Sequence, residues 1–364
     1  MPKVLELSKG IEDSVLGLLK FLLESGKVSG VITLTKMSES NTVAYSLITS
    51  PDLLRNASPL FPLMPVNAGK MLSRITLMEP SEKPIAVVMR PCELRGFVEL
   101  LKRTQGSSEN FLFISLTCGG VYTLKAAVDG DIEKKLPEYW ETVKKGEIVP
   151  DVRPNCAACT EFVPHTADMT VASFGNNDLE KRCEIYLNTE KAEAIVTEME
   201  GKISEREPNT KSLEALRSKR EGQTAKLLDE FKDMDVEKVF GSCIGCHACS
   251  NVCPACYCHL CFFDSPTSDH SARDYESKVE KEGSVRVPLD TIFYHLVRLF
   301  HVSLSCVGCG QCSDVCPVNI PLGIIAIKTS GPVQQAFDYV AGKSIEEGLP
   351  ITTFKPEEFA GVAD

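Results

Sequence analysis

Apolar side chains recur at helical spacing immediately after the first glycine of the chain. Between Gly10 and Gly26 the apolar positions share one face of a helix, and they are Ile11, Val15, Leu18, Leu19, Leu22 and Leu23. This period, closed by a glycine, predicts a helix with one buried side. Continuous apolar runs predict strands at 28–35, 43–49, 84–89 and 110–116. A helix over 94–104 separates the last two strands, so the order predicts an α/β domain with a mainly parallel sheet.

The pattern changes after residue 200. Residues 201–240 are dominated by charged and polar side chains, including the run Ser212-Leu-Glu-Ala-Leu-Arg-Ser-Lys-Arg, which predicts a solvated connecting helix with little core. An apolar-faced helix is expected over 290–301. We therefore predict an α/β domain at 1–200, a charged helical linker at 201–240, a small, mainly helical domain at 241–330 and a C-terminal tail at 331–364.

Composition narrows the function. The 364 residues include 39 Lys and Arg against 50 Asp and Glu, a net charge of −11, which disfavours binding to nucleic acid or to an anionic membrane. No apolar run approaches the ~20 residues that a membrane-spanning helix needs. The N-terminus lacks the basic and apolar regions of an export signal, so a cytoplasmic location is expected. In such a reducing compartment, 16 cysteines indicate metal binding rather than disulfides.

Two cysteine runs near the C-terminal end carry the strongest signal. Residues 243–254 and 306–317 both follow the pattern C-x2-C-x2-C-x3-C-P. In ferredoxins with this repeat, the fourth cysteine of each run ligates the cluster of the other run. We therefore assign one [4Fe–4S] cluster to Cys243, Cys246, Cys249 and Cys316. The other cluster is assigned to Cys306, Cys309, Cys312 and Cys253. Zinc also accepts four thiolates, but it requires no crosswise repeat.

Other cysteines leave two questions open. Cys256, Cys258 and Cys261 follow the first run, either as ligands of a further metal or as small side chains beside a cluster. In the first domain, Cys92 and Cys118 come just after predicted strands, where α/β sheets build their sites. Together with the pair Cys156 and Cys159 they allow a third [4Fe–4S] cluster, although a lone C-x2-C pair is common.

The order of these motifs resembles the F420 hydrogenase/dehydrogenase beta-subunit family, which includes the beta subunits of coenzyme F420-dependent formate dehydrogenases. The motifs are Arg90-Pro-Cys-Glu-Leu-Arg, Ser115-Leu-Thr-Cys-Gly-Gly, Asn155-Cys-Ala-Ala-Cys, Ala167-Asp-Met-Thr-Val-Ala-Ser-Phe-Gly-Asn, Cys253-Pro-Ala-Cys-Tyr-Cys and the closing cysteine run. The resemblance implies a flavin-type first domain that binds FAD and exchanges hydride with the deazaflavin. It also implies a cluster on Cys92, Cys118, Cys156 and Cys159. A partner subunit with a molybdenum or tungsten pterin is implied as well.

The same resemblance indicates loops for the flavin. The residues that match them are Lys9, Gly10, Asn56, Ser58, Asn67, Lys70, Gly175 and Asn176. Each of these residue types is also common in ordinary turns and helix caps. One segment departs from the family, because Ser8-Lys9-Gly10-Ile11 stands where members usually carry Cys-Gly-Gly.

Two functions follow. The first is an oxidoreductase subunit with FAD, which joins coenzyme F420 or another soluble two-electron carrier to a formate dehydrogenase alpha-type or heterodisulfide reductase-type partner. The second is a flavin-free iron–sulfur relay in a heterodisulfide reductase-, sulfhydrogenase- or sulfite reductase-type complex. A flavin accepts hydride and releases single electrons, so the first function needs no acid or base from the chain. The second function only passes electrons and needs none either. No catalytic residue is therefore assigned.

Overall fold

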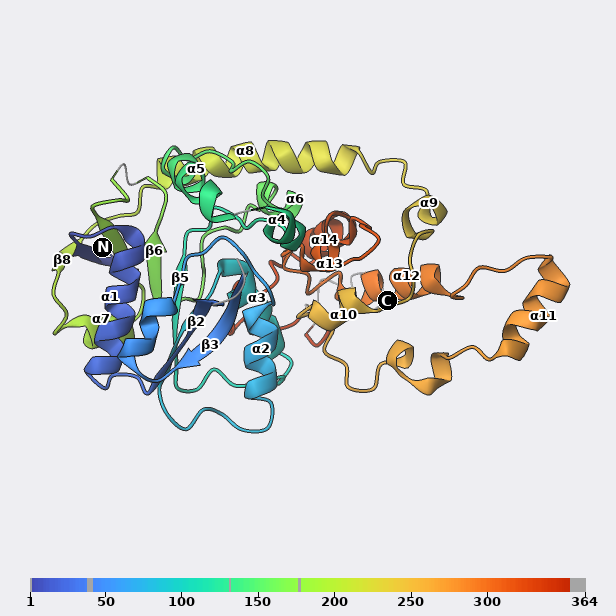
Figure 1. Ribbon diagram of the computed structural model, residues 1–364, viewed down its shortest axis with the longest axis horizontal. Coiled ribbons are helices and arrows are strands. Elements are labelled where there is room, and N and C mark those ends of the chain that lie inside the picture. Colours follow the sequence, from blue (N-terminus) through green and yellow to red (C-terminus); the bar gives the residue numbers. More distant parts are fainter. Residues whose placement is uncertain (1, 38–41, 131, 176–177, 354–364) are drawn as a thin grey trace, which may run out of the picture.

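The computed structural model describes residues 2–37, 42–130, 132–175 and 178–353. The first part of the chain folds around an eight-stranded sheet in the order β3-β2-β4-β5-β6-β7-β1-β8 (Figure 1). The strands are β1 (Lys3–Leu7), β2 (Gly30–Lys36), β3 (Val43–Ile48), β4 (Ile85–Val88), β5 (Phe111–Leu116), β6 (Met169–Ala172), β7 (Cys183–Leu187) and β8 (Lys202–Glu205). The predicted strands all form, with slightly different ends.

The sheet is mixed, and this corrects the expectation of a mainly parallel one. Strands β2, β4, β5 and β6 are parallel to one another, whereas the pairs β2–β3, β6–β7, β7–β1 and β1–β8 are antiparallel. A short connection, such as the one from β2 to β3, can join only antiparallel neighbours, because parallel strands need a long crossover. The parallel centre is the part that places Cys92 and Cys118 at one edge.

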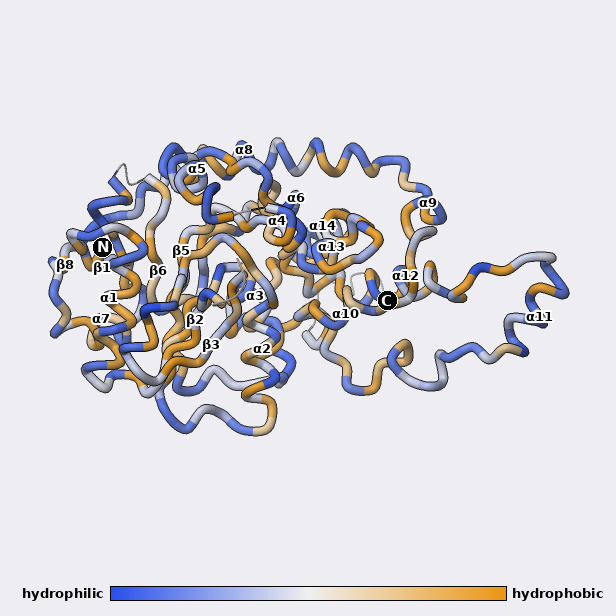
Figure 2. The backbone as a smooth tube through the Cα atoms, in the orientation of Figure 1, coloured by the Kyte–Doolittle hydropathy of each residue, from blue (hydrophilic) through white to orange (hydrophobic). Residues whose placement is uncertain are grey.

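Helices cover this sheet and complete its core. Helix α1 (Ile11–Glu24) buries Val15, Leu18, Leu19 and Leu22, as its period predicts. The other helical elements of this part are η1 (Pro51–Asn56), α2 (Ala68–Ile75), α3 (Pro91–Leu101), α4 (Leu124–Asp129), α5 (Ile132–Lys144), α6 (Pro154–Ala157) and α7 (Glu190–Val196). Figure 2 shows α1 and the central strands of the sheet as mostly hydrophobic. The long helix α8 (Thr210–Asp229), which follows β8, is mostly hydrophilic.

All regular elements in the described part of the C-terminal region are helical, as predicted. Its elements are α8 (Thr210–Asp229), α9 (Val236–Phe240), α10 (Ala248–Val252), η2 (Phe262–Asp264), η3 (Pro266–Ser268), α11 (Ala272–Glu282), α12 (Thr291–Val302), α13 (Gln311–Asp314) and α14 (Leu322–Ala336). A separate core forms here around Phe240, Tyr294, Leu299 and Ile325. Helix α11, which buries no residue, lies on an arm that extends away from the body (Figure 1). None of the described helices is long and apolar enough to cross a membrane.

Buried polar contacts join the two regions. Arg153, just before α6, forms an ion pair of 2.5 Å with Asp314 of α13, and both side chains are 2% exposed. After α14 the chain folds back onto α3, where the Gly342 N–H donates to Glu99 Oε1 over 2.7 Å. Arg95 of α3 also donates to the Ala341 carbonyl over 2.8 Å. The described part of the predicted tail therefore packs against the first region.

Candidate metal centres

Both cysteine runs form a tight loop followed by one short helix. In the first run, Cys249 lies on α10, and in the second run Cys312 lies on α13. Gly245 and Gly308 adopt φ values of +68° and +69°, which side chains with a Cβ rarely adopt. These turns direct backbone N–H groups at sulfur, as the 3.4 Å contact from Gly245 N to Cys243 Sγ shows. The loops are therefore shaped to stabilise thiolate charge.

The fold brings together the cysteines that the spacing assigned to each cluster. Cys253, from the first run, is an electrostatic neighbour of Cys306, Cys309 and Cys312. These four cysteines line one common cavity. In the reciprocal set, Cys316 is a neighbour of Cys243, as are Cys246 and Cys249. The crosswise arrangement is therefore a feature of the tertiary structure as well as of the sequence repeat.

The chemistry of these thiols suits a metal cluster. Burial raises the pKa of Cys306 to about 11 and the pKa values of Cys309 and Cys312 to about 12. A cluster ligates cysteine as thiolate, so binding would take the proton from each of these thiols. No three His, Cys, Asp or Glu side chains of the described residues are arranged to hold a single metal ion. A [4Fe–4S] cubane, which each set of four thiolates would ligate, is a larger group.

The third predicted set also converges in space. Cys92 lies in the first turn of α3, Cys118 follows β5, and Cys156 and Cys159 lie on and just after α6. Burial raises the pKa of each thiol, and the sulfur atoms act on one another electrostatically. Gly120 completes this packing, because at its φ of +107° a Cβ would come within 3.0 Å of Cys156 Cβ.

Two buried charged residues hold these loops. The Glu93 carboxylate accepts hydrogen bonds from Arg90 N at 2.9 Å and Ala68 N at 3.0 Å, which fixes the turn that carries Cys92. Arg220, from α8, donates to the carbonyl oxygens of Cys118 at 3.1 Å and Cys159 at 3.2 Å. The polar composition of 201–240 predicted a solvated helix, so the buried role of Arg220 was not expected. The only signal was Leu216 four residues before Arg220, and both are buried in the structure.

The third set lies next to the second cluster set. Cys309 contributes to the raised pKa of Cys92, after burial, which is the larger cause. The loops also touch directly, because Asn155 Nδ2 donates to the Gly308 carbonyl over 3.2 Å. The cysteine sets therefore form a continuous series from the sheet edge into the C-terminal region.

A cavity of about 680 Å³ lies near the third set. Gly10 and Ser58, two of the predicted flavin residues, line it together with Phe61 and Trp140. Trp140 packs edge-on against Tyr139 at 5.1 Å between ring centres. Tyr139 then donates from its hydroxyl to the Gly120 carbonyl over 2.9 Å. One layer of side chains thus connects the cavity to the third cysteine set.

Three other predicted flavin residues, Lys9, Asn56 and Gly175, do not line this cavity. Lys9 and Asn56 are exposed. Gly175 adopts a φ of +77° and lies against Asn209. Asn176 lies outside the described residues. The structure therefore brings only part of the predicted flavin set together.

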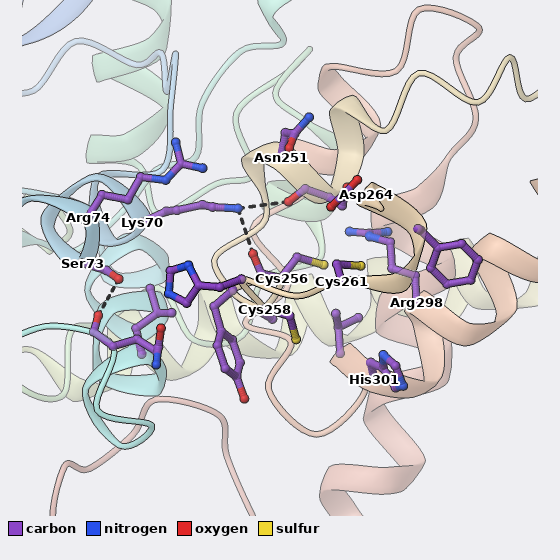
Figure 3. A pocket seen from close by; sticks show the side chains of 18 of the residues that line it. Lys70, Ser73, Arg74, Asn251, Cys256, Cys258, Cys261, Asp264, Arg298 and His301 are labelled. Atoms are coloured by element: carbon purple, nitrogen blue, oxygen red, sulfur yellow. Dashed lines mark hydrogen bonds between the residues drawn. The ribbon is translucent and has the colours of Figure 1, made fainter. Parts of the chain in front are cut away.

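Asn67 and Lys70 lie instead where the two regions meet. The Asn67 side chain caps α2 by accepting from Lys70 N over 3.2 Å. Lys70 Nζ donates to the carbonyl oxygens of Ser250, Cys253 and Cys256 at 2.9–3.0 Å (Figure 3). Lys70 therefore caps the C-terminal end of α10. It also holds the loop that places Cys253 in the second cluster set.

The three cysteines left open by the sequence line a second cavity, of about 220 Å³, in the same place. Cys256, Cys258 and Cys261 share it with Lys70 and Arg298 (Figure 3). The Cys256 thiol hydrogen-bonds to Cys253, which lowers the pKa of Cys253. Cys256 is thus a direct neighbour of a predicted cluster ligand.

The buried carboxyl of Glu12 should make the free energy of unfolding depend on pH. Burial beside the larger cavity raises the pKa of its carboxyl from 4.5 to about 7. The unfolded chain loses this proton at lower pH than the folded chain, so stability should fall as pH rises from about 4.5 to 7, by up to about 3 kcal/mol. Glu12→Gln should remove that slope and stabilise the protein at pH 7. Urea unfolding between pH 5.5 and 8 measures it. Asp13→Asn, at the exposed neighbour, is the control, and an unchanged slope in Glu12→Gln would contradict the assignment.

Comparisons with known proteins find matches in both regions of the chain. Residues 82–211 match the family model for the C terminus of the coenzyme F420 hydrogenase/dehydrogenase beta subunit, and residues 239–320 match the model of a 4Fe-4S dicluster domain. The chain is 26% identical over 373 residues to the F420-dependent formate dehydrogenase subunit beta of Methanocaldococcus jannaschii, covering 93% of each protein. It is 27% identical over 369 residues to subunit beta of F420-dependent formate dehydrogenase 1 of Methanococcus maripaludis, covering 90% of each.

Among solved structures, a chain of the F420-reducing [NiFe] hydrogenase complex from Methanosarcina barkeri superposes with a TM-score of 0.45 and 14% identity. The superposition covers 65% of this chain and 94% of the other. The sequence comparisons confirm the resemblance that the motifs predicted.

Proposed function

We propose that this chain, which its relatives identify as an oxidoreductase subunit of the formate dehydrogenase beta type, passes electrons between a flavin-linked two-electron carrier and a partner subunit. The observation that carries the proposal is the continuous series of cysteine sets. It begins beside the larger cavity, continues from Cys92 to Cys309, and ends at the set that contains Cys249. Such a series would conduct single electrons between the two regions.

The larger cavity is where a flavin would bind. Its volume of about 680 Å³ lies in the range of small-molecule sites, and Phe61, Leu136 and Trp140 give it the apolar walls that suit a flat ring. Gly10, in the lining, packs closely against the backbone of Glu180, because a Cβ there would come within 2.9 Å of the Glu180 carbonyl oxygen. A flavin, when bound, converts a hydride into two single electrons. The chain would bind and orient the ring and place it one layer from the third cluster.

The carrier and the partner follow from the relatives. We propose coenzyme F420 as the two-electron carrier, because the relatives over most of the chain are F420-dependent. The partner would be the catalytic molybdenum or tungsten subunit of a formate dehydrogenase. A heterodisulfide reductase-type subunit would receive electrons through the same clusters. FAD and this partner would make the chain one component of a hetero-oligomer.

One observation favours the alternative of a flavin-free relay. The lysines that line the larger cavity are already paired, Lys36 with Glu133 at 2.8 Å and Lys144 with Glu141 at 3.7 Å. A dinucleotide flavin also needs cations or N–H groups for its diphosphate. In the relay, the two C-terminal cysteine sets would carry electrons between two protein partners.

Iron, sulfide and flavin counts after anaerobic purification separate the two functions. Three clusters correspond to about 12 iron atoms per chain, and the proposed function requires about one FAD in addition. About 8 iron atoms without flavin would support a two-cluster relay and withdraw the proposed function. Cys118→Ser should lower the count by about 4 iron atoms, whereas Cys183→Ser, in the core of β7, should leave it unchanged.

A further inference from the structure

We infer that Arg298 is a positioning residue for both C-terminal clusters, and that its guanidinium lies between them and donates N–H groups to sulfur of each. The inference deepens the proposed function and rests on it only in requiring that the two cysteine runs hold clusters. The residue would raise the reduction potentials of both clusters together. No motif of the sequence indicated this role.

The Arg298 side chain is buried and incompletely satisfied. It projects from α12, is 5% exposed, and donates from Nη2 to the Cys249 carbonyl over 3.2 Å. Its Nε and Nη1 atoms are fully buried and have no hydrogen-bond partner in the described part of the chain. A buried donor without a partner is costly, so native proteins rarely keep one. Two such donors on one guanidinium indicate a group that binds at this place.

The surroundings show which group that is. Arg298 has four cysteines as electrostatic neighbours: Cys253 and Cys312 of the second set, Cys249 of the first set, and Cys256, which belongs to neither set. Among the described residues, no carboxylate forms an ion pair with Arg298. A buried charge requires compensation, and the negative charge of thiolate-ligated clusters supplies it.

The position of Arg298 and the contact of a neighbouring tyrosine favour the clusters over another ligand. Arg298 lines the cavity enclosed by the four cysteines of the second set, as well as the cavity of Figure 3. In the cavity of Figure 3, Lys70, which is half-buried, already donates to three carbonyl oxygens and does not create an anion site. Helix α12 also presents Tyr294, whose hydroxyl lies 3.4 Å from Cys249 Sγ. One face of this helix therefore contacts ligands of both clusters.

A fixed positive charge changes the energy of each added electron. Reduction makes a cluster more negative, so a nearby guanidinium stabilises the reduced form and raises the potential. The planar fork of arginine also directs its N–H groups along fixed lines, which the ammonium of lysine cannot reproduce. Because Arg298 lies between the two sets, both potentials should move in the same direction when it is replaced.

Redox titration of the purified full-length protein, followed by electron paramagnetic resonance, tests the charge. In Arg298→Met the ratio of reduced to oxidised cluster at a fixed potential should fall at least tenfold for both clusters, which equals about 59 mV for one electron. Arg273→Met, on the exposed helix α11, removes the same charge from the same region and should leave both potentials unchanged. Unchanged potentials in an Arg298→Met protein with full iron content would overturn the inference.

Pulsed electron paramagnetic resonance with [¹⁵N]arginine tests the hydrogen bonds, and it applies even if Arg298→Met fails to hold iron. The reduced wild-type clusters should show a nitrogen coupling that disappears in Arg298→Lys and persists in Arg273→Lys. A coupling that persists in Arg298→Lys contradicts the inference. The iron count of the wild-type protein keeps the two proposals apart, because a protein without the two clusters would fail the proposed function before Arg298 is tested.

Discussion

Replacement of Cys309 by Ser is expected to stop electron transfer from the first region to an acceptor while leaving the flavin content unchanged. Cys309 belongs to the second cluster set and is also the electrostatic neighbour of Cys92 in the third set. Neither Cys309 nor any other cysteine lines the cavity where the flavin would bind, so the change should not reach it. Loss of a residue that only supports a metal ligand costs up to about 100-fold in activity. Loss of the ligand Cys309 itself should therefore lower the rate of electron transfer at least ~100-fold.

Stopped-flow reduction can separate the two halves of this reaction. A two-electron donor should still reduce the flavin of the Cys309→Ser protein, whereas reduction of a one-electron acceptor dye should fail. Cys258→Ser is the matched control, because Cys258 is an exposed cysteine outside the three cluster sets. Undiminished acceptor reduction in Cys309→Ser would show that electrons do not pass through the second cluster.

Replacement of Asp314 by Asn is expected to destabilise the protein by about 3–5 kcal/mol, the usual cost of leaving one partner of a buried ion pair uncompensated. Asp314 accepts from Arg153 Nε at 2.9 Å and from Leu124 N at 3.0 Å, so one carboxylate holds two segments of the first region. Arg153 in turn donates to the Met64 carbonyl over 3.0 Å. The loss should therefore loosen the junction between the third and second cysteine sets.

Differential scanning calorimetry on the iron-loaded protein can measure this effect. Asp151→Asn is the control, because the Lys135–Asp151 pair has a length of 2.9 Å but side chains that are 40% and 70% exposed. Exposed pairs contribute at most about 1 kcal/mol. Arg153→Met and the double variant complete a thermodynamic cycle, in which the double variant should be less damaged than the sum of the single changes. Equal costs for Asp314→Asn and Asp151→Asn would refute the role of the buried pair.

Local patterns were predictable because their cause is local. The period of α1 depends on helix geometry, and the apolar runs that form β4 and β5 reflect burial on both faces of a sheet. The positions of Cys92 and Cys118 then follow from where those two strands end. The end of the sheet that holds β1 was less predictable, because β1 pairs with β7 and β8, which are distant from it in the sequence.

The flavin loops show the same limit at a candidate site. Gly10 and Ser58 meet at one cavity, but Lys70 reaches the loop of Cys253, about 180 residues away in the chain. Turn-like residue types have the same appearance in a sequence whether they cap a helix, as Asn67 does, or bind a ligand. Only the fold distinguishes these uses.

By itself, the sequence predicted the assignment of cysteines to two clusters, because ligands two or three residues apart on a tight loop can reach one cubane and the repeat specifies the exchange. Only the tertiary structure decided what surrounds those ligands. Arg220, Arg298 and Lys70 come from helices outside the cysteine runs, and each satisfies or charges a loop that is remote in sequence. Their roles depend on burial and on the cost of unpaired charge, which arise only when distant segments pack together.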